Sequence, residues 1–138
     1  MSFAAVPVVV DASIVIGAAT DESSAIATLD AVQMRTLLAP PLIWVETANV
    51  LVKRKHFSVP DALFVLRSME RLGLESADRG LDGLVEAMAL ADKHGLSVYD
   101  ATYLWLALDI GADLATLDRD LARAAAAEGV PLAIKIDG

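Results

Sequence analysis

Cysteine is absent from this sequence of 138 residues, and histidine occurs only twice, as His56 and His94. The lack of cysteine excludes disulfide bonds and thiolate metal sites, and it makes zinc a poor match for this chain. Any bound metal would have to be held by oxygen ligands or by these two histidines. Hard cations such as Mg²⁺ and Mn²⁺ suit oxygen ligands best.

Long uncharged stretches are missing as well. None is longer than ten residues, whereas a membrane-spanning helix needs about 20 apolar residues. No basic residue precedes the first apolar segment, so the sequence predicts no secretory signal. We therefore expect a cytoplasmic protein with no membrane segment. The length predicts one compact domain over residues 1–138.

Basic residues are scarce, since 11 lysines and arginines face 19 aspartates and glutamates, giving a net charge of −8. Proteins that bind nucleic acids usually carry a basic surface, so this balance is unusual for one of them. An acidic site for divalent cations would account for part of the excess. Hydrophobic residues reach 56 % and the mean hydropathy is +0.54. These values indicate either an alanine-filled core or apolar surface that a partner covers.

Short apolar runs alternate with longer helical patterns along the chain. Strands are predicted for residues 6–10, 37–39, 74–76, 113–116 and 132–136. Helices are predicted for residues 14–19, 22–37, 42–54, 59–72, 81–94, 99–110 and 118–128. Prolines near helix starts and glycines just past helix ends support these bounds. Strands separated by helices favour an α/β sandwich with a parallel sheet, whose ligands bind at the carboxyl ends of the strands.

Four acidic residues stand where these elements would bring them together. Asp11 directly follows the first strand and Asp118 the fourth, so both would lie at one edge of a parallel sheet. Asp100 opens an apolar helix, and Glu46 lies inside another. Burying a carboxylate there is costly unless a positive group meets it. Converging carboxylates with no lysine nearby in the sequence indicate a cation site.

Each of these acids, taken singly, also has an ordinary structural interpretation. Asp11 and Asp118 would serve equally well as helix N-caps. Asp100 would be favoured in a first helical turn by the helix dipole. Glu46 would fit a solvated stripe beside Asn49 or Lys53. The sequence leaves both interpretations open for each residue, although the four together favour a shared cation site.

Four segments, in order, resemble the motifs of PIN-domain ribonucleases, and in particular those of the VapC-type toxins of VapBC toxin–antitoxin pairs. These segments are VVVDASIVI (8–16), PPLIWVETANVL (40–51), SVYDATYLWLA (97–107) and LATLDRDLARAA (114–125). Each contains one of the four acids. Their order, their spacing and the chain length all match the VapC type, so the resemblance covers essentially the whole chain.

The resemblance implies a three-layer α/β/α PIN-like fold with a short central parallel sheet. It also implies an acidic pocket that binds Mg²⁺ or Mn²⁺ and cleaves RNA, formed by Asp11, Glu46, Asp100 and Asp118. Ser13 and Thr116 would support this pocket by hydrogen bonds. Asp120 is the alternative fourth acid. A residue two positions further along a helix points to another face, so we expect Asp118 and not Asp120 to reach the metal.

Basic side chains that would hold RNA occur in one dense segment, formed by Lys53, Arg54 and Lys55. This segment is either a solvated helix end or a set of phosphate contacts beside the pocket. His56 and His94 both follow basic residues near helix ends, so they form no convincing pair for metal-free acid–base cleavage of RNA.

Partners are implied by the resemblance and by the apolar composition. The resemblance implies a homodimer and inhibition by a cognate VapB-type antitoxin, with an arginine entering the acidic pocket. Helices 22–37 and 59–72 carry more apolar residues than one core face needs, namely Ile26, Leu29, Val32, Leu63, Phe64, Leu66 and Met69. A haloacid-dehalogenase-like phosphatase is disfavoured, because its second aspartate is replaced by Ser13. A non-catalytic PIN-like module that acts only through its protein partner remains the main alternative.

Overall fold

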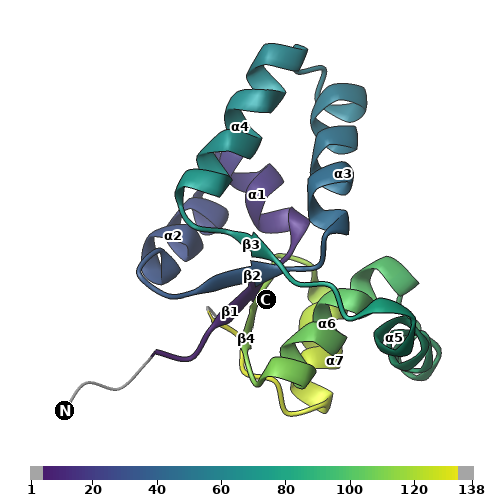
Figure 1. The fold of residues 1–138 in the computed structure, drawn as a ribbon. Coiled ribbons are helices and arrows are strands. Elements are labelled where there is room, and N and C mark those ends of the chain that lie inside the picture. The colour runs from purple at the N-terminus through teal and green to yellow at the C-terminus, as the bar shows by residue number, and fades with distance from the viewer. Residues whose placement is uncertain (1–4, 134–138) are drawn as a thin grey trace.

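The computed structural model describes residues 5–133, in which helices enclose a small sheet (Figure 1). The strands are β1 (Val8–Val10), β2 (Leu37–Ala39), β3 (Glu75–Ser76) and β4 (Asp113–Ala115). The helices are α1 (Ala12–Ala19), α2 (Ser23–Val32), α3 (Leu42–Asn49), α4 (Val59–Arg71), α5 (Gly80–His94), α6 (Val98–Ile110) and α7 (Arg119–Ala127). A π-helical turn, η1 (Val50–Arg54), continues α3.

The sheet is parallel throughout, with the strand order β3-β2-β1-β4. The three valines of β1 are completely buried, as expected of a central strand covered on both faces. Helices α1, α2, α3 and α4 lie on one side of the sheet, and α5, α6 and α7 lie on the other (Figure 1). The prediction of a three-layer α/β/α fold around a short parallel sheet is therefore confirmed.

Most predicted elements are found, but their ends differ. The first strand begins at Val8 and not at residue 6, and the helix predicted over 22–37 ends at Val32 in a turn. The helix predicted over 42–54 changes to π-helical geometry after Asn49. Of the strand predicted over 132–136, Leu132 forms an isolated bridge to Leu114, and residues 134–138 lie outside the described residues.

Side-chain caps determine where several helices begin. The Asp11 carboxylate accepts the backbone N–H of Ile14 at the start of α1. Ser58 and Ser97 cap α4 and α6 in the same way. Each cap satisfies an N–H group that has no partner inside its helix. The cap interpretation of Asp11 is thus correct, and it does not compete with a further role for the same side chain.

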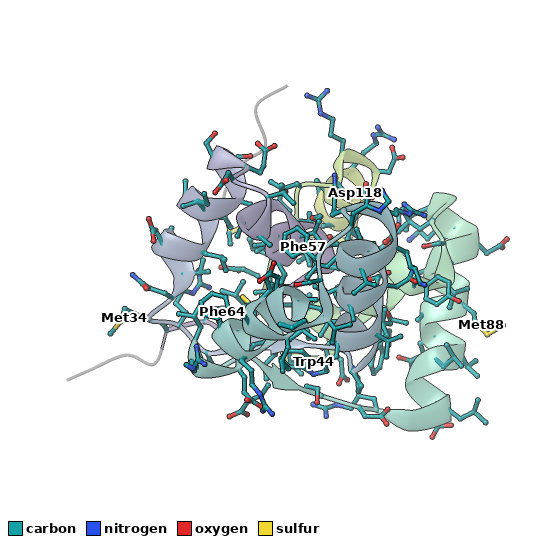
Figure 2. All side chains as sticks on the ribbon, turned by 90° about the horizontal axis from the view of Figure 1, so that it is seen from above. Met34, Trp44, Phe57, Phe64, Met88 and Asp118 are labelled. Carbon is teal, nitrogen blue, oxygen red and sulfur yellow. The ribbon has the colours of Figure 1, made fainter. Side chains whose placement is uncertain are left out.

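Several large apolar side chains lie outside the core in the described part of the chain. Figure 2 shows Met34 and Met88 at opposite outer edges of the molecule, and Phe64 is exposed as well. Four exposed apolar side chains of α5 form a stripe at helical spacing, namely Leu81, Leu84, Val85 and Met88. We call this set the α5 stripe. None of the helices described here has the length and apolar character needed to span a membrane.

Candidate active site

Asp11 lies at the carboxyl end of β1 and is only 4 % exposed. Its Oδ1 accepts a hydrogen bond of 2.5 Å from Ser13 Oγ, and its Oδ2 accepts one of 2.5 Å from Thr116 Oγ1. Both carboxylate oxygens therefore have a short hydrogen bond inside the protein. The side chain is held in one orientation at the edge of the sheet, as a preorganised ligand would require.

The two hydroxyls that contact Asp11 also join the loops after β1 and β4. Ser13 Oγ accepts the backbone N–H of Leu117 at 2.9 Å, and Thr116 Oγ1 accepts that of Asp118 at 2.9 Å. The loops are adjacent because β1 pairs in parallel with β4 and the N–H of Asp11 donates to the Ala115 carbonyl at 3.1 Å. This network places Asp11 and Asp118 at the same edge.

Glu46 projects from α3 and is half-buried. Its Oε1 accepts a hydrogen bond of 2.7 Å from the hydroxyl of Tyr103, a residue of α6 that is 1 % exposed. One carboxylate oxygen of Glu46 thus meets this tyrosine although the side chain stays half-exposed, and no ion pair joins Glu46 to Lys53 within residues 5–133. The contact gives the buried hydroxyl a charged acceptor.

Asp118 and Asp120 lie at the start of α7 in different surroundings. The Oδ1 atom of Asp118 accepts the N–H groups of Asp120 at 2.9 Å and of Leu121 at 3.1 Å, so Asp118 is the N-cap. The carboxylate of Asp120 is 72 % exposed and pairs with Arg123 at 3.1 Å. Asp120 therefore lies at the surface, whereas Asp118 lies beside Thr116, to which its N–H donates.

Asp100 lies in the first turn of α6, where its N–H donates to Ser97 Oγ at 3.0 Å. Burial raises the pKa of this half-buried carboxyl, and the charges of Asp118 and Asp120 raise it further. Asp100 in turn raises the pKa of Asp11 and of Glu46. We call Asp11, Glu46, Asp100 and Asp118 the acidic cluster; the more exposed Asp120 also acts on Asp100 from beside it.

Burial raises the pKa of Asp11 to about 7, against the hydrogen bonds from Ser13 and Thr116. Burial also raises the pKa of Glu46, although the hydrogen bond from Tyr103 opposes this change. No ion pair within residues 5–133 includes any member of the acidic cluster. The mutual repulsion of these carboxylates is therefore not offset by a neighbouring basic side chain.

A divalent cation fits this donor set chemically. The cluster offers carboxylate oxygens alone, and a cation would relieve both their burial and their repulsion. Among the residues that the structure describes, however, no three acids or histidines are already arranged as a metal-binding group. The four carboxylates are thus neighbours in an electrostatic sense and do not form a closed coordination shell.

A groove with a volume of about 450 Å³ adjoins the acidic cluster at Glu46. It is lined by Leu42, Val45, Glu46, Asn49, Val50, Arg54 and Tyr99. We call it the Glu46 groove. Of the predicted basic segment, only Arg54 lines this groove, while Lys53 and Lys55 are exposed elsewhere. Tyr99 and Asn49 were not predicted as site residues, although Tyr99 directly precedes Asp100 and Asn49 lies three positions after Glu46.

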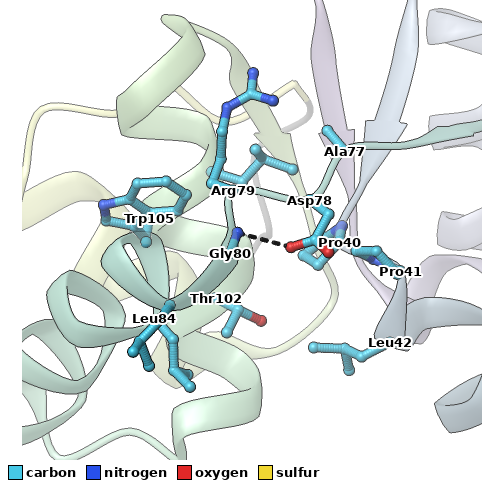
Figure 3. A pocket seen from close by; sticks show the side chains of 13 residues that line it. Pro40, Pro41, Leu42, Ala77, Asp78, Arg79, Gly80, Leu84, Thr102 and Trp105 are labelled. Carbon is cyan, nitrogen blue, oxygen red and sulfur yellow. Dashed lines mark hydrogen bonds between the residues drawn. The ribbon is translucent and has the colours of Figure 1, made fainter.

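A second groove, of about 490 Å³, lies between the start of α3 and helices α5 and α6 (Figure 3). Its wall includes Pro40, Leu84 and Trp105, and none of the acidic cluster lines it. Asp78 accepts the N–H of Gly80 at 2.8 Å at its rim. The lining is predominantly apolar, and its two charged residues are Asp78 and Arg79, of which Arg79 pairs with Asp109 at 2.9 Å. This groove therefore offers mainly shape and apolar contact.

Comparisons with known proteins agree with this geometry. A sequence profile of the PIN domain matches residues 8–127. Ribonuclease VapC3 of Pyrobaculum aerophilum is 62 % identical over 39 residues, which are 28 % of this chain and 30 % of that protein. The matched stretch thus spans less than a third of that relative.

Solved structures are similar over most of the chain. The crystal structure of PAE2754 from Pyrobaculum aerophilum has a TM-score of 0.64 and 27 % identity, covering 86 % of this chain and 84 % of the other. VapC20 of Mycobacterium tuberculosis, described as a toxin that cleaves the sarcin-ricin loop, has a TM-score of 0.68. It is 16 % identical, and the match covers 85 % of this chain and 94 % of that one. The likeness to VapC20 is one of fold.

Proposed function

This chain belongs to the PIN-domain family, and from that membership we propose that it is an Mg²⁺- or Mn²⁺-dependent endoribonuclease, the toxin of a type II toxin–antitoxin pair. The observation that carries the proposal is the acidic cluster at the carboxyl edge of the sheet, where hydrogen bonds of Thr116 place Asp11 beside Asp118. The effects of Asp100 on the pKa values of Asp11 and Glu46 agree with this placement. The stretch shared with a protein named ribonuclease VapC3 supports the same activity. RNA is the proposed substrate.

The acidic cluster would hold the cation, and its hydrogen bonds would keep the ligands in place. Ser13 and Thr116 restrain Asp11, while Tyr103 restrains one oxygen of Glu46. When bound, Mg²⁺ or Mn²⁺ supplies an activated water and offsets charge that develops on the phosphate. The other oxygen of Glu46 accepts no hydrogen bond within residues 5–133. This free oxygen is the group that would accept the proton of the attacking water.

A second copy of the chain is the proposed partner of the α5 stripe. Its residues follow the i, i+3, i+4, i+7 pattern of a helix face that packs against another helix. The stripe lies beside the apolar groove of Figure 3, to which it contributes Leu81 and Leu84. An apolar surface of this kind is stabilised when a partner removes it from water. A homodimer formed through α5 would leave the acidic cluster accessible.

A cognate VapB-type antitoxin is the proposed partner of α4. This helix exposes Val59, Leu63 and Phe64 (Figure 2 shows Phe64) and packs against α3, which carries Glu46. Two residues expected to be surplus, Val32 and Met69, are buried in the core instead. An antitoxin segment on α4 would bring an arginine to the acidic cluster, where it would replace the charge of the cation and block RNA.

The proposal is tested with the purified chain, freed of antitoxin and incubated with RNA in Mg²⁺ or Mn²⁺, in EDTA, and in EDTA followed by excess metal. We expect cleavage with metal, none in EDTA, and full recovery on adding the metal back. Asp100→Asn, prepared in the same way, separates this activity from a contaminating nuclease. Cleavage that persists in excess chelator would refute the metal mechanism. A folded chain that never cleaves RNA would instead favour a non-catalytic module that acts through its protein partner. The absence of a preformed metal-binding group among the described residues supports that alternative.

A further inference from the structure

We propose that the Glu46 groove is a subsite for one unpaired RNA nucleotide, in which Tyr99 stacks on the base and Arg54 binds the adjoining phosphate. This inference rests on the proposed ribonuclease function and adds to it a recognition mode for the substrate. Glu46 belongs both to the groove and to the acidic cluster. A nucleotide in the groove would therefore lie directly beside the phosphate that the activated water attacks.

Tyr99 is the aromatic member of the groove and is 66 % exposed. Its side-chain hydroxyl has no hydrogen bond within the described residues, whereas Tyr103, one helical turn later, is buried and bound to Glu46. The two tyrosines of the chain therefore differ in role: Tyr103 binds Glu46 inside the protein, and Tyr99 presents its ring at the surface. The packing of the core does not require Tyr99, but an exposed aromatic ring next to Asp100 is the kind of surface on which unpaired bases stack.

Arg54 lines the groove from the π-helical turn η1. The lining residues of α3 and the turn after it, namely Leu42, Val45, Glu46, Asn49 and Val50, follow the spacing of one α-helical face. Helical spacing continues that face at Lys53 or Arg54, three and four positions after Val50. In η1 the N–H of Lys55 donates to the Val50 carbonyl at 3.0 Å, five residues back, which inserts one residue into the turn. Of these two basic residues, Arg54 is the one that lines the groove.

The charges of the groove favour a nucleotide over a purely apolar occupant. Arg54 has no ion-pair partner in residues 5–133, so its guanidinium is available for a phosphate. Asn49 presents an amide that can both donate and accept hydrogen bonds at a base edge. Leu42, Val45 and Val50 supply apolar walls. A volume of about 450 Å³ lies within the range of small-ligand sites and accommodates a nucleotide.

The requirement for an unpaired base follows from the same geometry. Within a duplex, the face of each base is covered by its neighbours, and the ring of Tyr99 could not reach it without unstacking. Stacking on an aromatic side chain tolerates all four bases, so the subsite would select unpaired structure more than sequence. The groove would therefore direct cleavage toward loops and single-stranded segments of RNA.

The test measures binding of a short single-stranded RNA, with Mn²⁺ present, in the Asp118→Asn background that prevents cleavage. In that background Tyr99→Ala is expected to weaken binding about tenfold, whereas Tyr99→Phe stays within about twofold of the parent because the ring is kept. Arg54→Ala is expected to weaken binding by a similar factor and to reduce its salt dependence. Lys53→Ala removes the same charge from the adjacent position and is expected to cost threefold or less. Thermal melting of each variant verifies its fold.

Each outcome decides the proposal. Equal losses for Tyr99→Ala and Tyr99→Phe would show that the hydroxyl and not the ring matters, and unchanged affinity of Tyr99→Ala would remove the subsite altogether. In both cases the ribonuclease function would stand if the unmodified chain still cleaves RNA. A Tyr99→Ala chain that keeps its affinity for RNA but loses that for the antitoxin would reassign the groove to a peptide. Failure of the parent to bind RNA while the unmodified chain still cleaves it would overturn the subsite and leave the proposed function standing, whereas an unmodified chain that neither binds nor cleaves RNA would overturn both.

Discussion

The hydroxyl of Tyr103, buried in α6, donates a hydrogen bond of 2.7 Å to the Oε1 atom of Glu46 in α3, 57 positions earlier in the chain. This contact joins helices from opposite sides of the sheet at the acidic cluster. It also restrains one oxygen of Glu46, a residue that lines the Glu46 groove. The tyrosine thus acts as a positioning residue for a proposed metal ligand.

Tyr103→Phe is predicted to keep the fold and to weaken Mn²⁺ binding by about tenfold. Removing the hydroxyl leaves Glu46 unrestrained, and losing such supporting hydrogen bonds typically costs 10–100-fold in metal affinity or activity. Glu46 is half-exposed and can be hydrated, so the melting temperature of the metal-free chain is expected to change little. Isothermal titration calorimetry measures the affinity. A variant that binds Mn²⁺ as tightly as the unmodified chain would leave Tyr103 with a packing role only.

The metal-free chain is predicted to become less stable as the pH rises from about 4 to about 7. The pKa of Asp11 is about 7 in the folded chain, above its ordinary value of 3.8, so the folded state holds an extra proton across this interval. That stabilisation is present at low pH and is lost as the proton leaves, on the order of a few kcal/mol. The raised pKa values of Glu46 and Asp100 act in the same direction.

Denaturant unfolding in EDTA between pH 5 and 8 measures this dependence, with Asp11→Asn as the control. The control should flatten the profile, since it removes the titrating carboxyl but retains a side chain that can cap α1. Glu128 acts in the opposite sense, because hydrogen bonds from Lys93 and His94 lower its pKa. Its contribution is lost only as the pH falls below its ordinary range, so it does not disturb the interval. Stability that rises from pH 5 to 8 in EDTA would contradict the burial of an uncompensated Asp11.

Asp118→Asn is predicted to abolish RNA cleavage, and Asp120→Asn to reduce it by threefold or less. Asparagine at position 118 can still accept the N–H groups of Asp120 and Leu121, so the cap of α7 and the stability of the fold are retained while the charge is lost. Asp120 is directed to the surface, where it pairs with Arg123. Cleavage rates at saturating Mn²⁺ separate the two. The reverse order of effects would show that Asp120 is the acid of the cluster.

Val85→Glu is predicted to convert a homodimer into a monomer without unfolding it. Val85 is exposed within the α5 stripe, so the substitution adds a charge to the proposed interface and leaves the core untouched. Met34→Glu is the matched control, because Met34 is 93 % exposed and lies outside α5. Sedimentation velocity measures the mass of each. A Met34→Glu chain that dissociates, or an unmodified chain that is already monomeric, would contradict an interface at α5.

The sequence was sufficient to predict the layered fold because the strands are short apolar runs separated by capped helices. VVV of β1 followed by Asp11 could be recognised from burial pattern and position alone. The hydrogen-bond partner of Glu46 could not be predicted, because Tyr103 looks in the sequence like one more apolar residue of α6. The π-helical turn could not be predicted either. The spacing around Val50 is compatible with a continuous α-helix, and only the backbone geometry shows that Arg54 and not Lys53 lines the Glu46 groove.

The central claim is that the acidic cluster holds a divalent cation, and the most direct measurement is the anomalous scattering of crystals grown with Mn²⁺. The account predicts an anomalous peak among the carboxylates of Asp11, Glu46, Asp100 and Asp118. Crystals of the Asp100→Asn variant grown under the same conditions should lack this peak. A strong peak elsewhere, or none at a manganese concentration that supports RNA cleavage, would contradict it.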